Sequence, residues 1–373
     1  MALRYLIAFD RQSGAYYQGW RGRLSSIGLE PVVATESVRI WCNAPAEVVA
    51  TASGRTVVLG QLFTREDRPS RVIDLDPSID RVPDPPLHLS RHYWGRYVAV
   101  SRAAVGSVQI FRDPGGGLPC YVRETADHVL VFSDLGVLNA SGRPSPEIDW
   151  GGVRDALVWP ALRTSRTALR DIYEVPQGWL LGLGGKHFSE LRKVWSPWEH
   201  VAPTGLAGGE LAEALHSTVV GTVQALARGA DAVQLSLSGG LNSSIVAAAL
   251  TGTPTTGFNM VADGSHGDER ADARLVTDHL GLELVDRRYR LEDVDLARSS
   301  AAHLPRPVGN AARLAFDKAC LEFAKERGIP MLFSGFGGDN VFCYMRSVSP
   351  VVDLVRSRGS PAQYGVRSRI SAG

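Results

Sequence analysis

The stretch Gln234-Leu-Ser-Leu-Ser-Gly-Gly-Leu-Asn-Ser-Ser-Ile-Val-Ala-Ala248 decides the fold. An apolar, strand-like run enters Ser238-Gly239-Gly240, and a helical segment follows directly. Paired glycines let the backbone approach an anion closely, and the free N–H groups at the start of a helix point toward it. Ser243 and Ser244, like Ser238, add hydroxyl donors. The stretch therefore predicts an anion-binding loop at the carboxyl end of a strand, where α/β sheets bind their ligands.

Taken alone, this loop is also compatible with a plain glycine turn between a strand and a helix. It is not a Walker loop, because no Gly-Lys-Ser/Thr follows Gly239 and Gly240. It also lacks the Gly-x-Gly-x-x-Gly pattern of dinucleotide sites, so no nicotinamide or flavin cofactor is expected.

Segments of helical and stranded character alternate around the loop, which predicts a parallel sheet covered by helices. The predicted helices are 210–228, 242–250, 269–280 and 310–327, and the predicted strands are 232–237, 256–261, 282–289 and 330–333.

The first half of the chain is β-rich and has few helical patterns, of which Trp150–Trp159 is the best candidate. Composition changes at Val201–Gly209, which is typical of an interdomain linker. We therefore expect one domain at 1–200 and a second at 201–373. The strand-like runs of the first half are 5–9, 38–42, 57–63, 97–101, 108–111, 129–132 and 178–183.

The composition excludes several classes of protein. The 373 residues are 44% hydrophobic and 21% charged, as in globular proteins, and a net charge of +1 gives no bulk attraction to nucleic acid or membrane. No apolar run approaches the ~20 residues of a membrane span, and no signal-peptide core precedes the strand at Tyr5, so the predicted location is the cytoplasm. The four cysteines and nine histidines lack metal-ligand spacing, which disfavours a zinc enzyme and predicts buried, reduced cysteines.

A second motif, Met331-Leu-Phe-Ser-Gly-Phe-Gly-Gly-Asp-Asn-Val-Phe342, follows the first about ninety residues on. The first motif resembles the pyrophosphate loop of adenylate-forming ATP pyrophosphatases, Ser-Gly-Gly-x-Asp-Ser, with Asn242 in place of Asp. The second resembles the Ser/Thr-Gly-x-Gly-(Gly/Ala)-Asp-Glu-Leu-Phe motif of asparagine synthetases, with Asn340 in place of Glu. Its matching residues are Ser334, Gly335, Gly337, Gly338, Asp339 and Phe342.

Further segments resemble the same family over nearly the whole chain. Between the two motifs, Phe258-Asn-Met-Val and Gly267-Asp-Glu-Arg-Ala-Asp-Ala are similar to its second strand, which flanks the adenine, and to the acidic helix start that follows. In the first half, Tyr93–Val100, Phe111–Tyr121 and Val131–Asp134 resemble its glutaminase-like domain. The implied fold class is α/β with an α+β N-terminal part: a glutaminase-like (Ntn-type) β-sandwich, then an ATP-pyrophosphatase domain with a doubly wound parallel sheet.

The resemblance implies a ligase that uses ATP and Mg²⁺ to form an acyl-adenylate, which an amine then attacks. Glutaminases of this fold use an N-terminal cysteine, whereas this chain has Ala2, and its first cysteine, Cys42, lies within a predicted strand. A methyl group cannot attack an amide. The N-terminal domain is therefore expected to be catalytically inactive, and the amine to come from a source other than glutamine.

Three functions stay open at this point. The pattern is most similar to lasso peptide cyclases, which join a peptide's N-terminal amine to an Asp or Glu side chain. The implied partners would be a precursor peptide and possibly a leader-binding protein and a leader peptidase, with no nucleic acid and no membrane. The alternatives are a small-molecule amide ligase of the asparagine or β-lactam synthetase type, and a non-catalytic homologue that acts as a binding partner.

The resemblance also implies roles for individual residues. Asp339 and Asn242 would be catalytic and hold Mg²⁺, although an amide binds Mg²⁺ less strongly than a carboxylate does. The chain also stops at Gly373, early for this family, so we expect a truncation that removes a lysine on the pyrophosphate and the base for the amine. The implied ATP-binding residues are Leu237 and Met260 at the adenine, Ser238, Gly239, Gly240, Ser243 and Ser244 at the pyrophosphate, and Ser334 and Gly335 at the acyl group.

Overall fold

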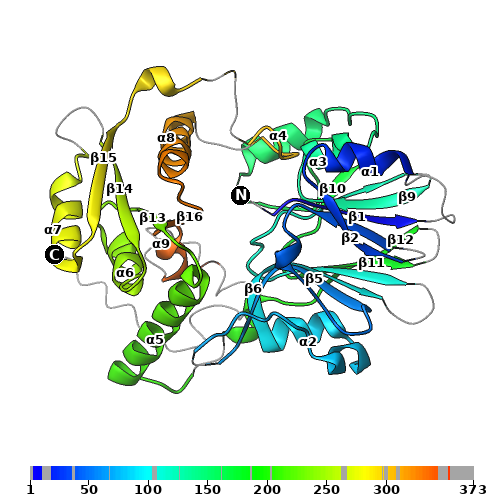
Figure 1. The fold of residues 1–373 in the computed structure, drawn as a ribbon, viewed down its shortest axis with the longest axis horizontal. Coiled ribbons are helices and arrows are strands. Elements are labelled where there is room, and N and C mark those ends of the chain that lie inside the picture. The colour runs from blue at the N-terminus through cyan, green and yellow to red at the C-terminus, as the bar shows by residue number, and fades with distance from the viewer. Residues whose placement is uncertain are drawn as a thin grey trace.

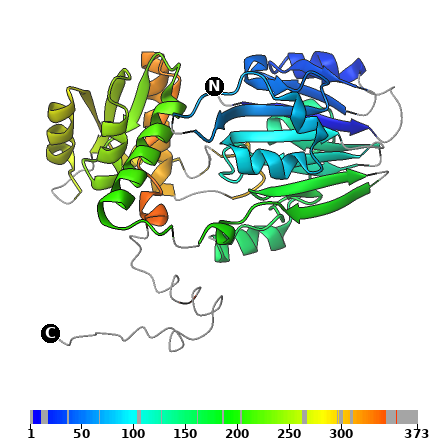
Figure 2. The ribbon, with the colours of Figure 1, turned by 90° about the horizontal axis from the view of Figure 1, so that it is seen from below.

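The computed structural model of this chain describes residues 3–10, 18–35, 38–66, 68–102, 107–125, 127–160, 162–184, 187–201, 204–261, 267–295, 297, 301–307, 311–342 and 352. Figure 1 shows two bodies, with the N-terminal strands stacked in one and a smaller sheet flanked by helices in the other, and Figure 2 shows the same two bodies from below.

The N-terminal body is a sandwich of two six-stranded sheets in which every pair of neighbours is antiparallel. The first sheet, in the order β10-β8-β9-β1-β3-β2, contains Ile172–Glu174, Tyr121–Glu124, His128–Phe132, Tyr5–Asp10, Val38–Cys42 and Glu30–Ala34. The second, in the order β12-β11-β7-β6-β5-β4, contains His187–Lys193, Trp179–Gly184, Val108–Arg112, Tyr93–Arg102, Thr56–Thr64 and Val48–Ala50.

One hydrophobic core fills the space between these sheets, because alternate residues of each strand point inward. Ile7 and Ile40 of the first sheet meet Leu59 and Val98 of the second. On the outer face of the first sheet lie α1 and α3, and α2 covers the second (Figure 1). The helices of this half are α1 (Gln18–Ser25), α2 (Pro85–His92), α3 (Leu135–Ala140) and α4 (Trp150–Val158), with short 3₁₀ turns at Pro45–Glu47, Pro77–Arg81 and Pro197–His200.

The C-terminal body is built on a parallel four-stranded sheet in the order β15-β14-β13-β16. Helices α5, α6 and α7 pack on one face, while α8 packs on the other through Phe323 against Phe258. The chain moves outward from β13 to β15 and then returns through α8 to β16, on the other side of β13. Its strands are β13 (Val233–Ser236), β14 (Thr255–Val261), β15 (Glu283–Arg288) and β16 (Met331–Ser334), and its helices are α5 (Gly208–Ala227), α6 (Leu241–Ala249), α7 (Arg270–Leu280), α8 (Ala311–Arg327) and α9 (Gly338–Val341), with a 3₁₀ turn at Leu291–Asp293.

The predicted fold class is confirmed, a β-sandwich followed by a doubly wound parallel sheet. The helix predicted at Trp150–Trp159 and the alternation predicted after residue 209 are also present, with ends shifted by at most two residues. The short helices α1, α2 and α3 were not predicted. Cys42, Cys120 and Cys320 are free and buried, as predicted, while Cys343 lies outside the described residues. Within the described residues, no helix is long and apolar enough to cross a membrane.

Segment 301–307, between β15 and α8, crosses to the N-terminal body (Figure 1, orange stretch beside α4). His303 and Pro305 accept backbone hydrogen bonds from Leu135 and Ala168 of that body, at 2.8 and 2.9 Å. Arg306 donates from Nε to the carboxylate of Glu174 in β10 at 2.7 Å. The two bodies are therefore joined by a docked segment as well as by the linker before α5.

Candidate functional site

The loop between β13 and α6 is braced by its own serines. The Ser243 hydroxyl donates to the carbonyl of Gly240 at 3.0 Å and lies 3.2 Å from the Ser238 hydroxyl. Ser244 also donates to Gly240, at 2.9 Å. No side chain caps the start of α6. The serines therefore hold the loop in shape, while the first N–H groups of the helix lack a side-chain acceptor, an arrangement suited to an anion.

Two glycines of the second motif press directly on this loop. A Cβ atom at Gly335 would lie 2.6 Å from the backbone nitrogen of Ser243, and one at Gly338 would lie 2.6 Å from Cγ of Asn242. The amide of Asn242 then donates to the Asp339 carboxylate, with 2.7 Å between Nδ2 and Oδ1. The structure thus brings together two motifs that lie ninety-seven residues apart, counted between Asn242 and Asp339.

Both motifs line one pocket of about 1280 Å³. Two of the predicted site residues are not in its lining, Gly239 and Ser244. Gly239 instead has a left-handed φ of 78° and packs so closely on the first turn of α7 that a Cβ would lie 2.3 Å from the carbonyl carbon of Asp272. The predicted residues that do line the pocket are Leu237, Ser238, Gly240, Asn242, Ser243, Met260, Ser334, Gly335 and Asp339.

The backbone groups of Leu237 are already engaged within the protein. Its N–H donates to the carbonyl of Phe258 at 2.9 Å, and its carbonyl accepts from the buried side chain of Asn259 at 2.8 Å. A carbonyl has two lone pairs, so one acceptor site remains at Leu237 for a ligand. Met260, the other residue predicted at the adenine, is half-buried in the pocket wall.

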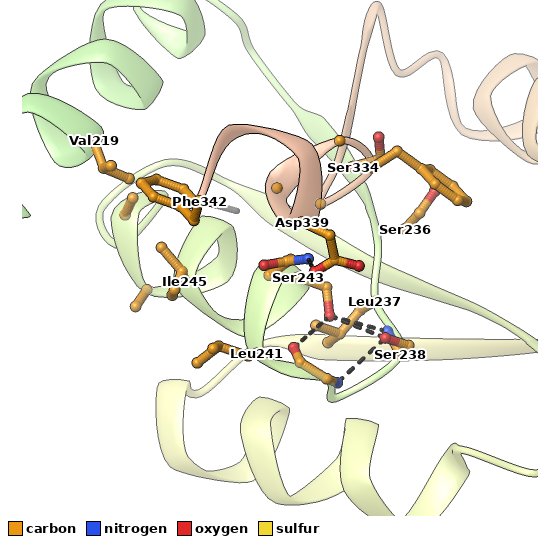
Figure 3. A pocket seen from close by; sticks show the side chains of 18 of the residues that line it. Val219, Ser236, Leu237, Ser238, Leu241, Ser243, Ile245, Ser334, Asp339 and Phe342 are labelled. Carbon is orange, nitrogen blue, oxygen red and sulfur yellow. Dashed lines mark hydrogen bonds between the residues drawn. The ribbon is translucent and has the colours of Figure 1, made fainter. Parts of the chain in front are cut away.

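Sequence analysis missed the apolar side of the pocket. Figure 3 shows Val219, Ile245 and Phe342 gathered on one side, with Ser238, Ser243 and Asp339 on the other. Leu215 and Val219 are one helical turn apart on α5. Their i, i+4 spacing, on the helix that precedes the loop, could have predicted an apolar wall. The pocket can therefore hold a ligand with a charged end and an apolar end.

The acidic start of α7 lies at the same pocket. Glu269 precedes the first residue of α7 and lines the cavity, whereas Asp268 pairs with Arg270 at 2.6 Å. The hydrogen bond from Arg270 lowers the pKa of the Asp268 carboxyl to about 2. Asp268 is therefore ionised at neutral pH.

Asn is a common N-cap residue, but Asn242 does not cap helix α6. Gly240 is the N-cap residue and Leu241 the first residue of α6, so Asn242 lies inside the first turn. Its amide contacts Asp339 rather than the helix backbone. The described residues contain no cluster of three or more His, Cys, Asp or Glu side chains that could hold a metal ion unaided.

A family model described as asparagine synthase matches residues 214–358, which contain both motifs. No curated protein sequence matches this chain. Among solved structures, a glutamine phosphoribosylpyrophosphate amidotransferase from B. subtilis, complexed with ADP and GMP, is 10% identical over 88% of this chain and 90% of its own, with a TM-score of 0.32. A glutamine-dependent NAD⁺ synthetase from Acinetobacter baumannii, complexed with ADP, is 15% identical over 50% of this chain and 38% of its own, with a TM-score of 0.28. These structural similarities are weak.

Proposed function

Because residues 214–358 form a domain of the asparagine synthase family, we propose that this protein is an ATP-dependent carbon–nitrogen ligase that works through an acyl-adenylate. The observation that carries the proposal is the interlock of the two motifs around one pocket, with Asn242 and Asp339 in hydrogen-bond contact. In the first step a carboxylate oxygen of the substrate attacks the α-phosphorus of ATP, and the bond to pyrophosphate breaks. In the second step an amine attacks the acyl carbon, AMP leaves, and the nitrogen loses a proton.

The residues of the pocket have separate tasks in this reaction. The loop Ser238–Ser243 and the start of α6 bind the pyrophosphate end of ATP through backbone N–H groups. Met260 and the carbonyl of Leu237 lie where the adenine binds, and Ser334 and Gly335 lie beside the reacting acyl group. Stabilisation of charge by positioned donors is the main contribution to catalysis in such phosphoryl chemistry.

Asp339 and Asn242 fit a Mg²⁺ site that ATP completes. The Asp339 carboxylate is exposed at the pocket wall, and the Asn242 side chain adjoins it. Mg²⁺ is usually bound by one or two carboxylates together with substrate phosphates, so this pair is a sufficient protein contribution. The chemistry that Mg²⁺ would supply there is neutralisation of charge on the phosphates. Asp339 would hold the ion, and the amide oxygen of Asn242 would be the weaker ligand.

Within this class we favour macrolactam formation on a precursor peptide, as in lasso peptide cyclases, with a leader-binding protein and a leader peptidase as partners. Glutamine is not the nitrogen source, since Ala2, which lies outside the described residues, stands where a nucleophilic cysteine is needed. A small-molecule amide ligase and a non-catalytic binding protein are the alternatives. Asn242 and Asn340, which replace two acidic residues of the family pattern, favour the non-catalytic alternative.

ATP binding tests the core of the proposal. We expect calorimetry to show binding of ATP in the presence of Mg²⁺, and no binding of NAD⁺ or FAD, because the loop has the shape for phosphates and lacks a dinucleotide pattern. GTP at the same concentration is the control for base selectivity. Absence of ATP binding, both with and without a carboxylate substrate, would contradict the proposal.

The substitution Asn242→Asp is expected to raise ATP–pyrophosphate exchange at saturating Mg²⁺. The contact to Asp339 at 2.7 Å would then join two carboxylates, which repel unless a cation lies between them. Mg²⁺ should therefore bind more tightly, and thermal stability should depend on Mg²⁺ in the variant more than in the parent. The matched control Asn139→Asp, at an exposed position of α3 outside the pocket, should leave this dependence unchanged. Equal exchange rates and equal Mg²⁺ dependence for N242D and the parent would show that position 242 is not a metal ligand.

A further inference from the structure

A second cavity, a trench of about 330 Å³, runs between α8 and the edge strand β16. Its α8 wall is one helical face, since Arg313, Asp317 and Leu321 recur at intervals of four residues. Its floor is formed by Leu332 and Ser334, alternate residues of β16 that point to the side of the sheet where α8 lies. The trench exists because α8 packs on β14 and β15, through Phe258 and Val285. Leu332 of β16 is left 44% exposed.

The trench opens into the larger pocket that both motifs line, which we call the ATP pocket. Four residues line both cavities: Ser236, Phe316, Ser334 and Phe336. Ser334 and Phe336 flank Gly335, which presses on the first motif. A molecule lying in the trench would therefore have its reacting end at the junction with the ATP pocket.

Arg313 is placed to receive a negative charge at this junction. Its guanidinium lies 4.6 Å from the centre of the Phe336 ring, and its ion pair with Asp317 is long, at 3.8 Å. Among the described residues it makes no hydrogen bond that would occupy its donors. A guanidinium with free N–H groups binds a carboxylate in a bidentate manner, and the aromatic ring beneath fixes its orientation.

The remaining chemistry of the trench fits an extended peptide. Leu321 and Leu332 are 49% and 44% exposed, although both are large and apolar. Within the part of the chain that the structure describes, β16 pairs only with β13, so its other edge has unpaired backbone groups. An extended segment can add to such an edge and place alternate side chains on an apolar floor. Burial raises the pKa of the Cys320 thiol to about 11, so this wall residue is neutral and not a nucleophile.

We propose that this trench binds the acyl substrate, and that the substrate is a peptide whose Asp or Glu side chain is directed by Arg313 to the ATP pocket. The inference rests on the proposed ligase function and its peptide substrate, and it adds the site that binds the peptide and the residue that positions its carboxylate. Arg313 acts as a specificity-determining residue, because it pairs with the acceptor carboxylate before adenylation.

The test uses the full chain and a library of N-acetylated hexapeptide amides, each with one Asp or Glu among apolar residues. ATP–pyrophosphate exchange is measured with each peptide and with free aspartate and glutamate. We expect exchange with a subset of peptides and not with the free amino acids.

For the best peptide, Arg313→Gln should raise the KM for the peptide about tenfold or more, which is the effect of losing one charged hydrogen-bond pair, and should leave the KM for ATP unchanged. Arg313→Lys should recover part of the loss, because it keeps the charge and loses the fork.

Two further variants separate the trench from general effects on the fold. Leu332→Glu, at an exposed position, adds a negative charge to the floor and should also raise the peptide KM. Lys318→Gln, on the same helix but outside the trench lining, removes an exposed cation that pairs with Asp293 and should leave the peptide KM unchanged.

The outcomes distinguish this inference from the function on which it depends. Loss of ATP binding in the parent protein would overturn the ligase proposal itself. ATP binding, with exchange that is equal for peptides and free aspartate or is insensitive to R313Q and L332E, would overturn the trench assignment alone. ATP binding with no exchange for any peptide, together with unchanged maleimide labelling of Leu332→Cys when the peptide pool is added, would also overturn it.

Discussion

Replacing Gly335 by alanine is expected to reduce ATP–pyrophosphate exchange by about 100-fold or more, the scale of a misplacement of about 1 Å in a reacting site. The added methyl would lie 2.6 Å from the nitrogen of Ser243 and 2.8 Å from the carbonyl carbon of Asn242. Both are backbone atoms at the start of α6, so neither can rotate away. The second motif must then withdraw from the first, and the contact from Asn242 to Asp339 is lost.

The measurement combines exchange kinetics, calorimetric titration with ATP, and thermal denaturation. Gly209→Ala is the matched control, because a Cβ at that position in α5 meets no atom within 4 Å. This control should leave ATP–pyrophosphate exchange unchanged and slightly stabilise α5, because alanine has a higher helix propensity than glycine. A G335A protein that retains the activity of the parent would mean that the two motifs need not be in contact for function.

Replacing Glu174 by alanine is expected to lower the free energy of unfolding by about 3–5 kcal/mol, the typical effect of breaking a buried ion pair by removing one partner. The Glu174 side chain is only 5% exposed and receives Nη1 of Arg112 and Nε of Arg306, both at 2.7 Å. Arg112 is itself 6% exposed, so its charge would be left buried and without its carboxylate. Arg306 would also lose the contact that fixes segment 301–307.

Denaturant unfolding monitored separately in the two bodies would measure this effect, and limited proteolysis within 301–307 would report release of the segment. Glu147→Ala is the control, since Glu147 and Arg170 form an exposed pair that should contribute at most about 1 kcal/mol. If E174A unfolds within 1 kcal/mol of E147A, the Glu174 cluster does not hold the two bodies together.

The C-terminal body was largely predictable because its signals are local. Strands β13, β14 and β16 contain short apolar runs, each followed by a helix, and such alternation specifies a parallel sheet. The N-terminal helices were harder to predict. The start of α2 is capped by Asp84 and contains Pro85 and Pro86, a start signal that the surrounding β-rich pattern obscured. The short strands β8 and β10 have few apolar residues of their own and depend on their neighbours in the sheet.

The polar half of the site was predictable because glycines and serines at this spacing indicate an anion-binding loop. The contact between Gly335 and Ser243 was not, because close approach of two backbones leaves no pattern in either segment alone. The trench was unpredictable for a similar reason. Arg313, Asp317 and Leu321 suggest an ordinary mixed helix face until the position of β16 beside them is known.

The buried contact between Glu174 and Arg306 couples the evolution of the two halves of this chain, since it joins a residue of one half to a residue of the other. A neutral residue at 174 would leave Arg306 of the other half, and Arg112 beside it, without their shared carboxylate, so a change at 174 is tolerated only with matching changes at the arginines. Exchange of the N-terminal body between related chains should therefore fail unless segment 301–307 is transplanted with it. That dependence gives the N-terminal body a structural role, as the fixed support for the segment that leads into α8 and the trench.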